Sequence, residues 1–411
     1  MPTGPRHAQN LLLKDQRMAD TACALDVGSD GSEAVIVKDE TGTMPGDIPS
    51  LNGIRAISVI IVLLSHAGFE RIVPGGLGVT IFFFLSGFLI TTLLLREQAQ
   101  FGSINIPAFY LRRFYRLIPP LLVTLAIAYG LTYVGILAGN ITPEGILVQL
   151  FYFANYFEIF FDGSAKIPAG TGVLWSLAVE EHFYIVFPLV MSLGFLIGLS
   201  SRSKLFVALA LCGIILLWRI FLVYGLNVPA SRTYYGSDTR FDSILYGCIL
   251  AFAAATWGKQ DYRNLSRLSW PEWVLLAAGL LLLSATFIIR DPQFRETFRY
   301  SLQGIALIPI FHLAVNRPQS WPFRFLDNRF LVRLGIYSYS IYLIHRVFIV
   351  ALFDNVELLA AHPVLLALAS FGLSVLFAAF VDRYVDRYFR RRRARMRRAT
   401  IAPTTAQTVP G

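Results

Sequence analysis

A histidine and an arginine share one helical face in the first strongly apolar segment of the chain. The segment reads LNGIRAISVIIVLLSHAG and places Arg55 eleven residues before His66. Eleven residues at about 100° each return to nearly the same face of an α-helix, and their rise separates the two side chains by about 16 Å. An imidazole is suited to general acid-base chemistry, and a guanidinium to holding an anion. A hydrogen-bonded packing role for His66 is the alternative.

A second apolar segment carries a carboxylate beside a hydroxyl. In GVLWSLAVEEHFYIVFPL, Ser176 and Glu180 lie at i and i+4 on one helical face, directly after Trp175. A carboxylate costs about 2.5–3.5 kcal/mol to insert into a membrane, so it normally faces a polar cavity or a partner. We therefore predict a site role for Glu180, and we expect Glu181 and His182 to face elsewhere.

Basic and small residues in three other apolar segments are further candidates. FYLRRFYRLIPP places Arg113 and Arg116 on one helical face, where guanidinium groups either grip phosphates or mark the cytoplasmic side. GIYSYSIYLIHRVF places His345 about a dozen residues into its segment. FFFLSGFLI contains Ser86 and Gly87, two small residues that allow either close helix packing or a slot for a slim ligand.

The segment SDTRFDSILYG alternates acidic and basic side chains. Asp238, Arg240 and Asp242 are each separated by one residue. The pattern precedes an apolar run, so these charges are expected near a membrane boundary. They either form a structural ion pair or bind a polar ligand.

The composition indicates that all these residues belong to membrane-spanning helices. Of 411 residues, 55% are hydrophobic and 15% charged, whereas about 25% are charged in soluble proteins. We expect an all-α, polytopic integral membrane bundle of about ten transmembrane helices, because apolar runs long enough for a hydrocarbon core of about 30 Å recur. The net charge of +10 comes from basic clusters between these runs. This arrangement indicates positive-inside topology and argues against nucleic-acid binding. The expected spans are 52–69, 77–96, 118–138, 176–199, 205–225, 241–257, 272–289, 300–316, 333–352 and 362–384.

An eleventh apolar stretch, Ile146–Phe161, is short for a span. If it does not cross, every basic loop falls on the cytoplasmic side. We therefore expect one re-entrant or interfacial helix here, on the extracytoplasmic side. Both termini are then cytoplasmic: residues 1–46 form a disordered tail, 47–389 the transmembrane domain, and 390–411 a basic, disordered tail that can touch anionic membrane lipid.

This topology brings ionisable side chains from separate helices to one depth. His66, Glu180 and His345, together with Asp238 and Asp242, all fall in the extracytoplasmic half of the membrane. Convergence of groups that are costly in lipid predicts a site rather than packing. A carrier or flippase that relays protons through the same charges is the competing interpretation, although no inverted repeat is evident.

Six of these blocks, in this order, resemble the membrane acyltransferase-3 family, which O-acylates sugars of bacterial envelope polysaccharides and some glycosides. They are the Arg55-x10-His66 pair, FFFLSGFLI, RRFYRLIPP, WSLAVEEHFY, DTRFDSILYG and YSYSIYLIH. The resemblance extends from about Ile48 to about Phe389. The family more often has glutamine where this chain has His182, so His182 is not assigned to the site.

The resemblance implies an O-acyltransferase of the bacterial inner membrane that takes an acyl group, most often acetyl, from cytoplasmic acyl-coenzyme A. Acyl-coenzyme A is then a co-substrate, and no permanently bound cofactor or metal is expected. The residues expected to hold the donor are Arg55, Ser86, Arg113 and Arg116.

On this resemblance, His66 acts as general base on a hydroxyl of an extracytoplasmic or lipid-linked carbohydrate, and Glu180 orients the imidazole or the acceptor. A transient acyl-histidine is the alternative. We expect no hydrolase-like domain of the kind fused to some relatives after the last span. The chain is then expected either to complete the transfer or to hand the acyl group to a separate extracytoplasmic protein. The residues expected to support the acceptor are Trp175, Ser176, Asp238, Arg240, Asp242 and His345.

Overall fold

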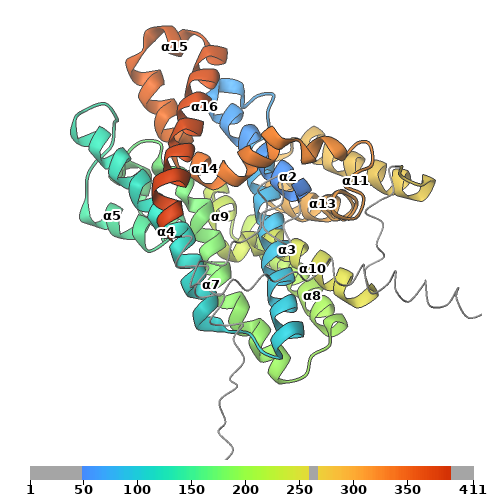
Figure 1. Ribbon diagram of the computed structural model, residues 1–411. Helices are drawn as coiled ribbons and strands as arrows, with labels where there is room; N and C mark the ends of the chain where they lie inside the picture. Colours follow the sequence, from blue (N-terminus) through green and yellow to red (C-terminus); the bar gives the residue numbers. More distant parts are fainter. Residues whose placement is uncertain (1–48, 259–266, 390–411) are drawn as a thin grey trace, which may run out of the picture. The chain divides into compact units, whose positions relative to one another are not determined.

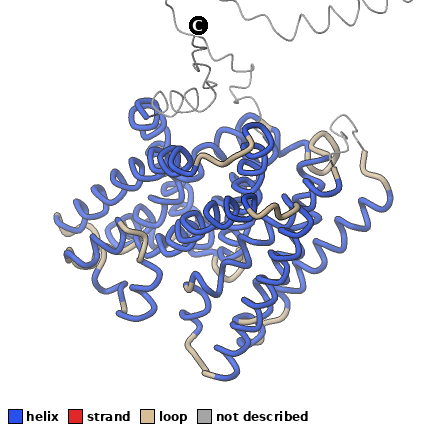
Figure 2. Tube along the Cα trace, turned by 90° about the horizontal axis from the view of Figure 1, so that it is seen from below, coloured by secondary structure: helices blue, strands red, loops and turns tan. Residues whose placement is uncertain are grey.

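The structure, a computed structural model, describes residues 49–258 and 267–389. These residues form helices joined by loops, and no strand occurs among them (Figure 1, Figure 2). The expected tails at 1–46 and 390–411, and the basic residues Lys259 and Arg263, lie outside the described residues.

The long helices match the ten predicted spans. Nine helical segments of the described chain are long and apolar enough to cross a membrane, and the tenth long helix, α10, carries the charges of the SDTRFD pattern. The chain is therefore a polytopic helical membrane protein. The long helices are α2 (Pro49–Leu64), α3 (Gly75–Phe101), α4 (Ile106–Tyr133), α7 (Leu174–Leu196), α8 (Ser201–Ile220), α10 (Ser237–Trp257), α11 (Trp270–Ile288), α13 (Phe298–Asn316), α14 (Arg329–Asn355) and α16 (Pro363–Phe380).

Short helices occupy the connections and the ends of the long ones. Those of the α type are α5 (Pro143–Leu150), α6 (Ala154–Phe161), α9 (Ala230–Tyr235), α12 (Pro292–Glu296) and α15 (Glu357–Ala361). Turns of 3-10 helix are η2 (Gly163–Lys166), η3 (Thr171–Val173) and η5 (Arg324–Asp327). Turns of π-helix end three long helices: η1 (Ser65–Phe69) follows α2, η4 (Phe221–Gly225) follows α8, and η6 (Val381–Asp386) follows α16.

The segment predicted to be re-entrant or interfacial does not cross as one helix. Helices α5 and α6 have eight residues each, about 12 Å, and they are separated by Tyr152, whose φ is 60°. The two ends of the segment meet, because the Thr142 hydroxyl donates to the Lys166 carbonyl at 3.1 Å. A crossing segment would separate its ends by about 30 Å. Helices α5 and α6 therefore form a hairpin, which returns to the side of the membrane on which it starts.

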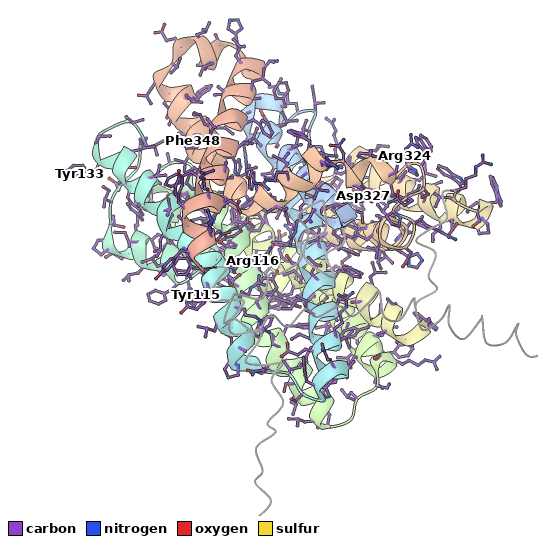
Figure 3. The ribbon with its side chains drawn as sticks, viewed as in Figure 1. Tyr115, Arg116, Tyr133, Arg324, Asp327 and Phe348 are labelled. Carbon is purple, nitrogen blue, oxygen red and sulfur yellow. The ribbon has the colours of Figure 1, made fainter. Side chains whose placement is uncertain are left out.

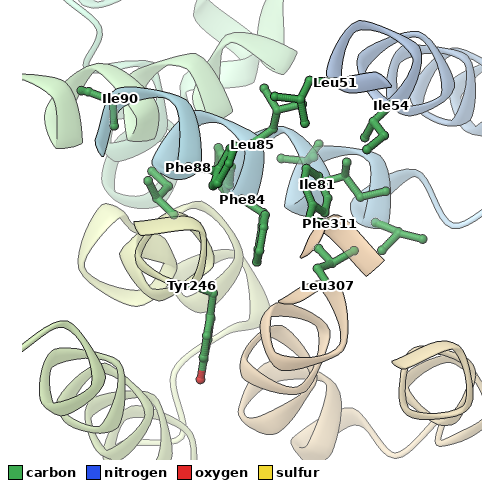
Figure 4. Close-up of a cluster of buried hydrophobic side chains, with 14 of the residues drawn as sticks. Leu51, Ile54, Ile81, Phe84, Leu85, Phe88, Ile90, Tyr246, Leu307 and Phe311 are labelled. Atoms are coloured by element: carbon green, nitrogen blue, oxygen red, sulfur yellow. The ribbon is translucent and has the colours of Figure 1, made fainter. Parts of the chain in front are cut away.

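Two glycines allow α3 and α10 to touch backbone to backbone. A Cβ atom on Gly87 would clash with the carbonyl oxygen of Ile244, and one on Gly247 would clash with that of Phe84. This contact confirms the packing interpretation for Gly87. Figure 4 shows the apolar cluster beside it, where the Phe84 and Phe311 rings lie 4.5 Å apart between centroids. The contact fixes the rotation of α3, and with it the direction of Ser86.

Candidate functional site

The two predicted histidines meet directly. His66 Nδ1 lies 2.9 Å from His345 Nε2, and the rings stack with centroids 5.2 Å apart. His66 belongs to the π-turn η1, a distortion that is frequent at functional sites. His345 comes from the middle of α14 and is fully buried, whereas His66 is half-buried. Helices α2 and α14 thus place an accessible imidazole against a buried one.

The hydrogen bonds of His345 fix the proton positions of the pair. Its Nδ1 lies 2.7 Å from the backbone carbonyl oxygen of Tyr342. A carbonyl oxygen only accepts, so His345 Nδ1 carries the hydrogen and Nε2 of the neutral ring accepts. Burial favours the neutral ring. His66 Nδ1 must then donate to His345, which leaves the lone pair on His66 Nε2. That nitrogen is the one able to accept a proton from a ligand.

Ser176 is connected to this pair through a tyrosine. The hydroxyls of Ser176 and Tyr342 lie 2.6 Å apart, and the ring of Tyr342 lies 5.5 Å from that of His345 between centroids. Tyr342 also donates to the carbonyl of Val173 at 3.3 Å. These contacts tie the start of α7 to α14. These contacts connect four side chains, which we call the polar track: His66, His345, Tyr342 and Ser176.

Glu180 belongs to a neighbouring cluster rather than to the histidine pair. Its carboxylate accepts from the Tyr184 hydroxyl at 3.3 Å and lies against the Ser86 side chain. No hydrogen bond joins Glu180 to His66 within the described part of the chain. The group in contact with the His66 imidazole is therefore His345 and not Glu180.

The two arginines expected to act together are separated. Arg113 turns into the bundle, where it donates to Glu181 at 3.3 Å and its guanidinium lies 3.0 Å above the centre of the Tyr184 ring. Arg116, three residues later, is exposed (Figure 3). Helix α4 begins at Ile106, well before the predicted span, and runs through Pro119. Arg113 therefore lies within the helical bundle, not in a loop at its boundary.

The alternating charges of α10 pair with other helices and not with one another. Asp238 binds Arg232 and the Trp218 indole, and Asp242 binds Arg219 at 2.7 Å. Both side chains of the second pair are fully buried. The Asp242 carboxylate also accepts from the Ser301 hydroxyl at 2.9 Å. These two aspartates hold α10 against α8, α9 and α13.

Arg240 lies in an aromatic cage and is fully buried. Its guanidinium donates to the Tyr234 carbonyl and the Thr80 hydroxyl, both at 3.3 Å. The cage rings, at 4.0–5.8 Å from the guanidinium carbon, are those of Phe83, Trp175, Tyr234 and Tyr300. Trp175 also packs on Tyr235, with centroids 5.1 Å apart. Arg240 thus contacts the ring of Trp175, which the sequence analysis assigned to the acceptor.

Arg55 and His182 are the remaining residues that the sequence analysis considered. Arg55 is half-buried on α2, about 16 Å along the helix from His66. His182 accepts or donates a hydrogen bond with Ser237 at 2.7 Å and stacks on Tyr156 with centroids 5.8 Å apart. His182 therefore joins α7 to α6 and α10.

Sequence reasoning missed three residues near the clusters. Tyr342 and Glu181 complete the two clusters described above. Arg346 follows His345 on α14, and its half-buried guanidinium lies within electrostatic range of His66 and Tyr235. The sequence did contain a signal for Arg346, which is its position directly after His345. A charge that deep in an apolar segment is costly, so it indicates a functional role.

Comparison with known proteins gives one family along almost the whole described chain. A family model described as an acyltransferase domain matches residues 48–383. No solved structure matches the chain.

Relatives from Staphylococcus aureus are about one-third identical. The O-acetyltransferase OatA of strain NCTC 8325 is 30% identical over 362 residues, which cover 85% of this chain and 58% of the relative. A protein of strain COL, provisionally named an O-acetyltransferase, is 31% identical over 356 residues, covering 84% and 57%. The chain thus spans a little more than half of the length of these relatives.

Proposed function

The chain belongs to the membrane acyltransferase-3 family, and from this premise we propose that it transfers an acyl group, acetyl in the first instance, from acyl-coenzyme A to a carbohydrate hydroxyl. On this proposal the donor arrives from the cytoplasm, the acceptor is extracytoplasmic or lipid-linked, and the chain resides in the bacterial inner membrane with both termini cytoplasmic. The observation that carries the proposal is the His66–His345 pair, whose hydrogen bonds leave a lone pair on His66 Nε2.

His66 acts as the general base in this reaction. Its Nε2 takes the proton of the acceptor hydroxyl while the hydroxyl oxygen attacks the thioester carbonyl carbon. The tetrahedral intermediate collapses, the carbon–sulfur bond breaks, and the imidazolium returns the proton to the coenzyme A thiolate. The products are the acyl ester and free coenzyme A. His345 accepts the hydrogen bond from His66 Nδ1 throughout and so stabilises the imidazolium.

The aromatic cluster supports a carbohydrate as the acceptor. Trp175, Tyr234 and Tyr235 pack with centroids 4.8–5.1 Å apart, and Trp175 is adjacent to Ser176 on the track that leads to His66. Flat apolar ring faces with polar edges suit the alternating apolar and hydroxyl faces of a sugar. Arg240 packs against the rings of Trp175 and Tyr234. Asp238 pairs with Arg232 of α9, the helix that carries Tyr234 and Tyr235.

Arg346 is proposed to stabilise the oxyanion that forms on the thioester carbonyl, because its guanidinium follows His345 on α14 and lies within electrostatic range of His66. Arg346→Gln is expected to lower kcat about 100-fold with little change in either KM. Arg346→Lys should recover part of the loss, and Arg295→Gln, an exposed change on α12, should have no effect. A raised acceptor KM with normal kcat would instead assign Arg346 to the acceptor.

A transfer assay tests the proposed function itself. Membranes that contain the chain are given acetyl-coenzyme A labelled in the acetyl group and a crude envelope glycan. The expected result is alkali-labile label on the glycan, because an O-acetyl ester is cleaved by base. Mass spectrometry of the product then identifies the acyl group and the acceptor. Movement of the glycan across the membrane with no ester formed would favour the alternative, a carrier or flippase.

A further inference from the structure

A lateral groove runs between α4 and α7. It has a volume of about 550 Å³ and extends along α4 from Pro107 to Ile118. Eleven residues of α-helix correspond to a length of about 17 Å. Its walls are mostly apolar, with Ile185 of α7 at one edge. On the proposed topology, the Pro107 end lies toward the cytoplasm.

Charged groups form the polar part of this otherwise apolar groove. Arg113 and Glu181 both line it and pair at 3.3 Å, with 21% and 11% of their side chains exposed. Glu181 is the eighth residue of a 23-residue helix, so it lies about 10 Å from one end of α7 and about 22 Å from the other. An ion pair that is partly open to the groove at that depth is costly in hydrocarbon and marks a polar ligand.

The hairpin between α5 and α6 places an unsatisfied hydroxyl in the same groove. Tyr152 lines it, and its buried hydroxyl has no hydrogen-bond partner. The backbone of Tyr152 is left-handed, with φ 60°, a conformation that is strained for a non-glycine residue and clusters at ligand sites. A ligand with hydrogen-bonding groups along an apolar chain would satisfy this hydroxyl.

Contacts between side chains connect the groove to the candidate active site. Tyr184 lines the groove and donates to Glu180, and Glu180 lies against Ser86. One turn earlier on α7, Ser176 begins the track to His345 and His66. Polar side chains therefore lead from the groove to the base.

We propose that this groove binds the pantetheine arm of the donor thioester, an inference that rests on the proposed function. The arm is a narrow chain with two amides, and the groove offers a narrow path with Arg113, Glu181 and the Tyr152 hydroxyl as partners. Arg113 contacts the arm and not the phosphates. Exposed groups such as Arg116 bind the phosphates instead. A lipid acyl chain would fill the apolar walls but has no group for the ion pair or the hydroxyl.

Matched tryptophan substitutions on α7 test the occupant. Ile185 and Leu189 lie one turn apart with 54% and 51% of their surfaces exposed, but only Ile185 lines the groove. Ile185→Trp is expected to weaken binding of labelled acetyl-coenzyme A to the purified chain at least tenfold, because the indole fills the groove. Leu189→Trp should leave that affinity unchanged. A second groove variant, Leu111→Trp, should behave like Ile185→Trp.

The outcomes separate this inference from the proposed function, because binding is measured without an acceptor. Equal acetyl-coenzyme A affinity in the Ile185→Trp and Leu189→Trp variants would overturn the groove assignment while leaving transfer by the wild-type chain intact. Loss of a co-purifying lipid from Ile185→Trp, with normal donor affinity, would show that a lipid chain is the occupant. A wild-type chain that neither binds nor transfers the acetyl group would refute the proposed function.

Discussion

His66→Ala is expected to lower kcat for acyl transfer by about 10²–10⁴-fold, the range for loss of a general base. The imidazole is the group whose Nε2 lone pair is fixed by the chain of hydrogen bonds from Tyr342 through His345. Donor binding should be nearly unchanged, because His66 does not line the proposed pantetheine groove. Initial rates of acetyl transfer at saturating donor and acceptor measure the effect.

Two further histidine variants make this test specific. His345→Asn changes a positioning residue, since His345 touches His66 and is itself fully buried. It should lower kcat with unchanged KM and shift the pH profile of kcat, a change that general loss of structure would not produce. His312→Ala, at an exposed histidine on α13, should keep wild-type activity. Full transfer by His66→Ala would remove the base assignment, and labelled acyl-histidine in the wild type would favour the covalent alternative.

Asp242→Asn is expected to destabilise the protein by about 3–5 kcal/mol, because it leaves the Arg219 cation buried without its partner. Both side chains of this pair have no exposed surface, and the pair joins α8 to α10. The loss should appear as a lower thermal unfolding midpoint in detergent and as faster proteolysis. Activity should fall only in proportion to the folded fraction, since neither residue contacts His66 or the groove.

Asp238→Asn is the matched control on the same helix. Its carboxylate is 36% exposed, and its partner Arg232 16%. Partly exposed pairs contribute about 0–1 kcal/mol, so this variant should unfold close to the wild type. Replacing both members of the buried pair, Arg219→Met with Asp242→Leu, should recover much of the stability lost in Asp242→Asn. Equal destabilisation by Asp242→Asn and Asp238→Asn would contradict burial as the cause.

The sequence determined the spans and the depth of the candidate residues. Apolar runs of sufficient length predict membrane helices because backbone groups must be satisfied internally in lipid. The positions of the basic loops predicted that Ile146–Phe161 does not cross, and its ends do meet at Thr142 and Lys166. Depth follows from residue count and rise alone, so the sequence also predicted that His66 and His345 lie at one level.

Only the tertiary structure decided which side chains face one another. Helix rotation is set by contacts distant in sequence, such as Gly87 against Ile244, and these contacts carry no local signal. For this reason the sequence did not predict that Arg113 pairs with Glu181 and is separated from Arg116. Nor did it predict that Asp242 pairs with Arg219.

The same reason applies to the base itself. The sequence showed that an apolar helix carries the imidazole of His66. It did not show which of the two ring nitrogens holds the lone pair, because this is set by the carbonyl of Tyr342 and the ring of His345. Both belong to α14, and His345 is 279 residues away from His66 along the chain. Residue type and depth are properties of one helix, whereas tautomer and pairing are properties of the packing between helices.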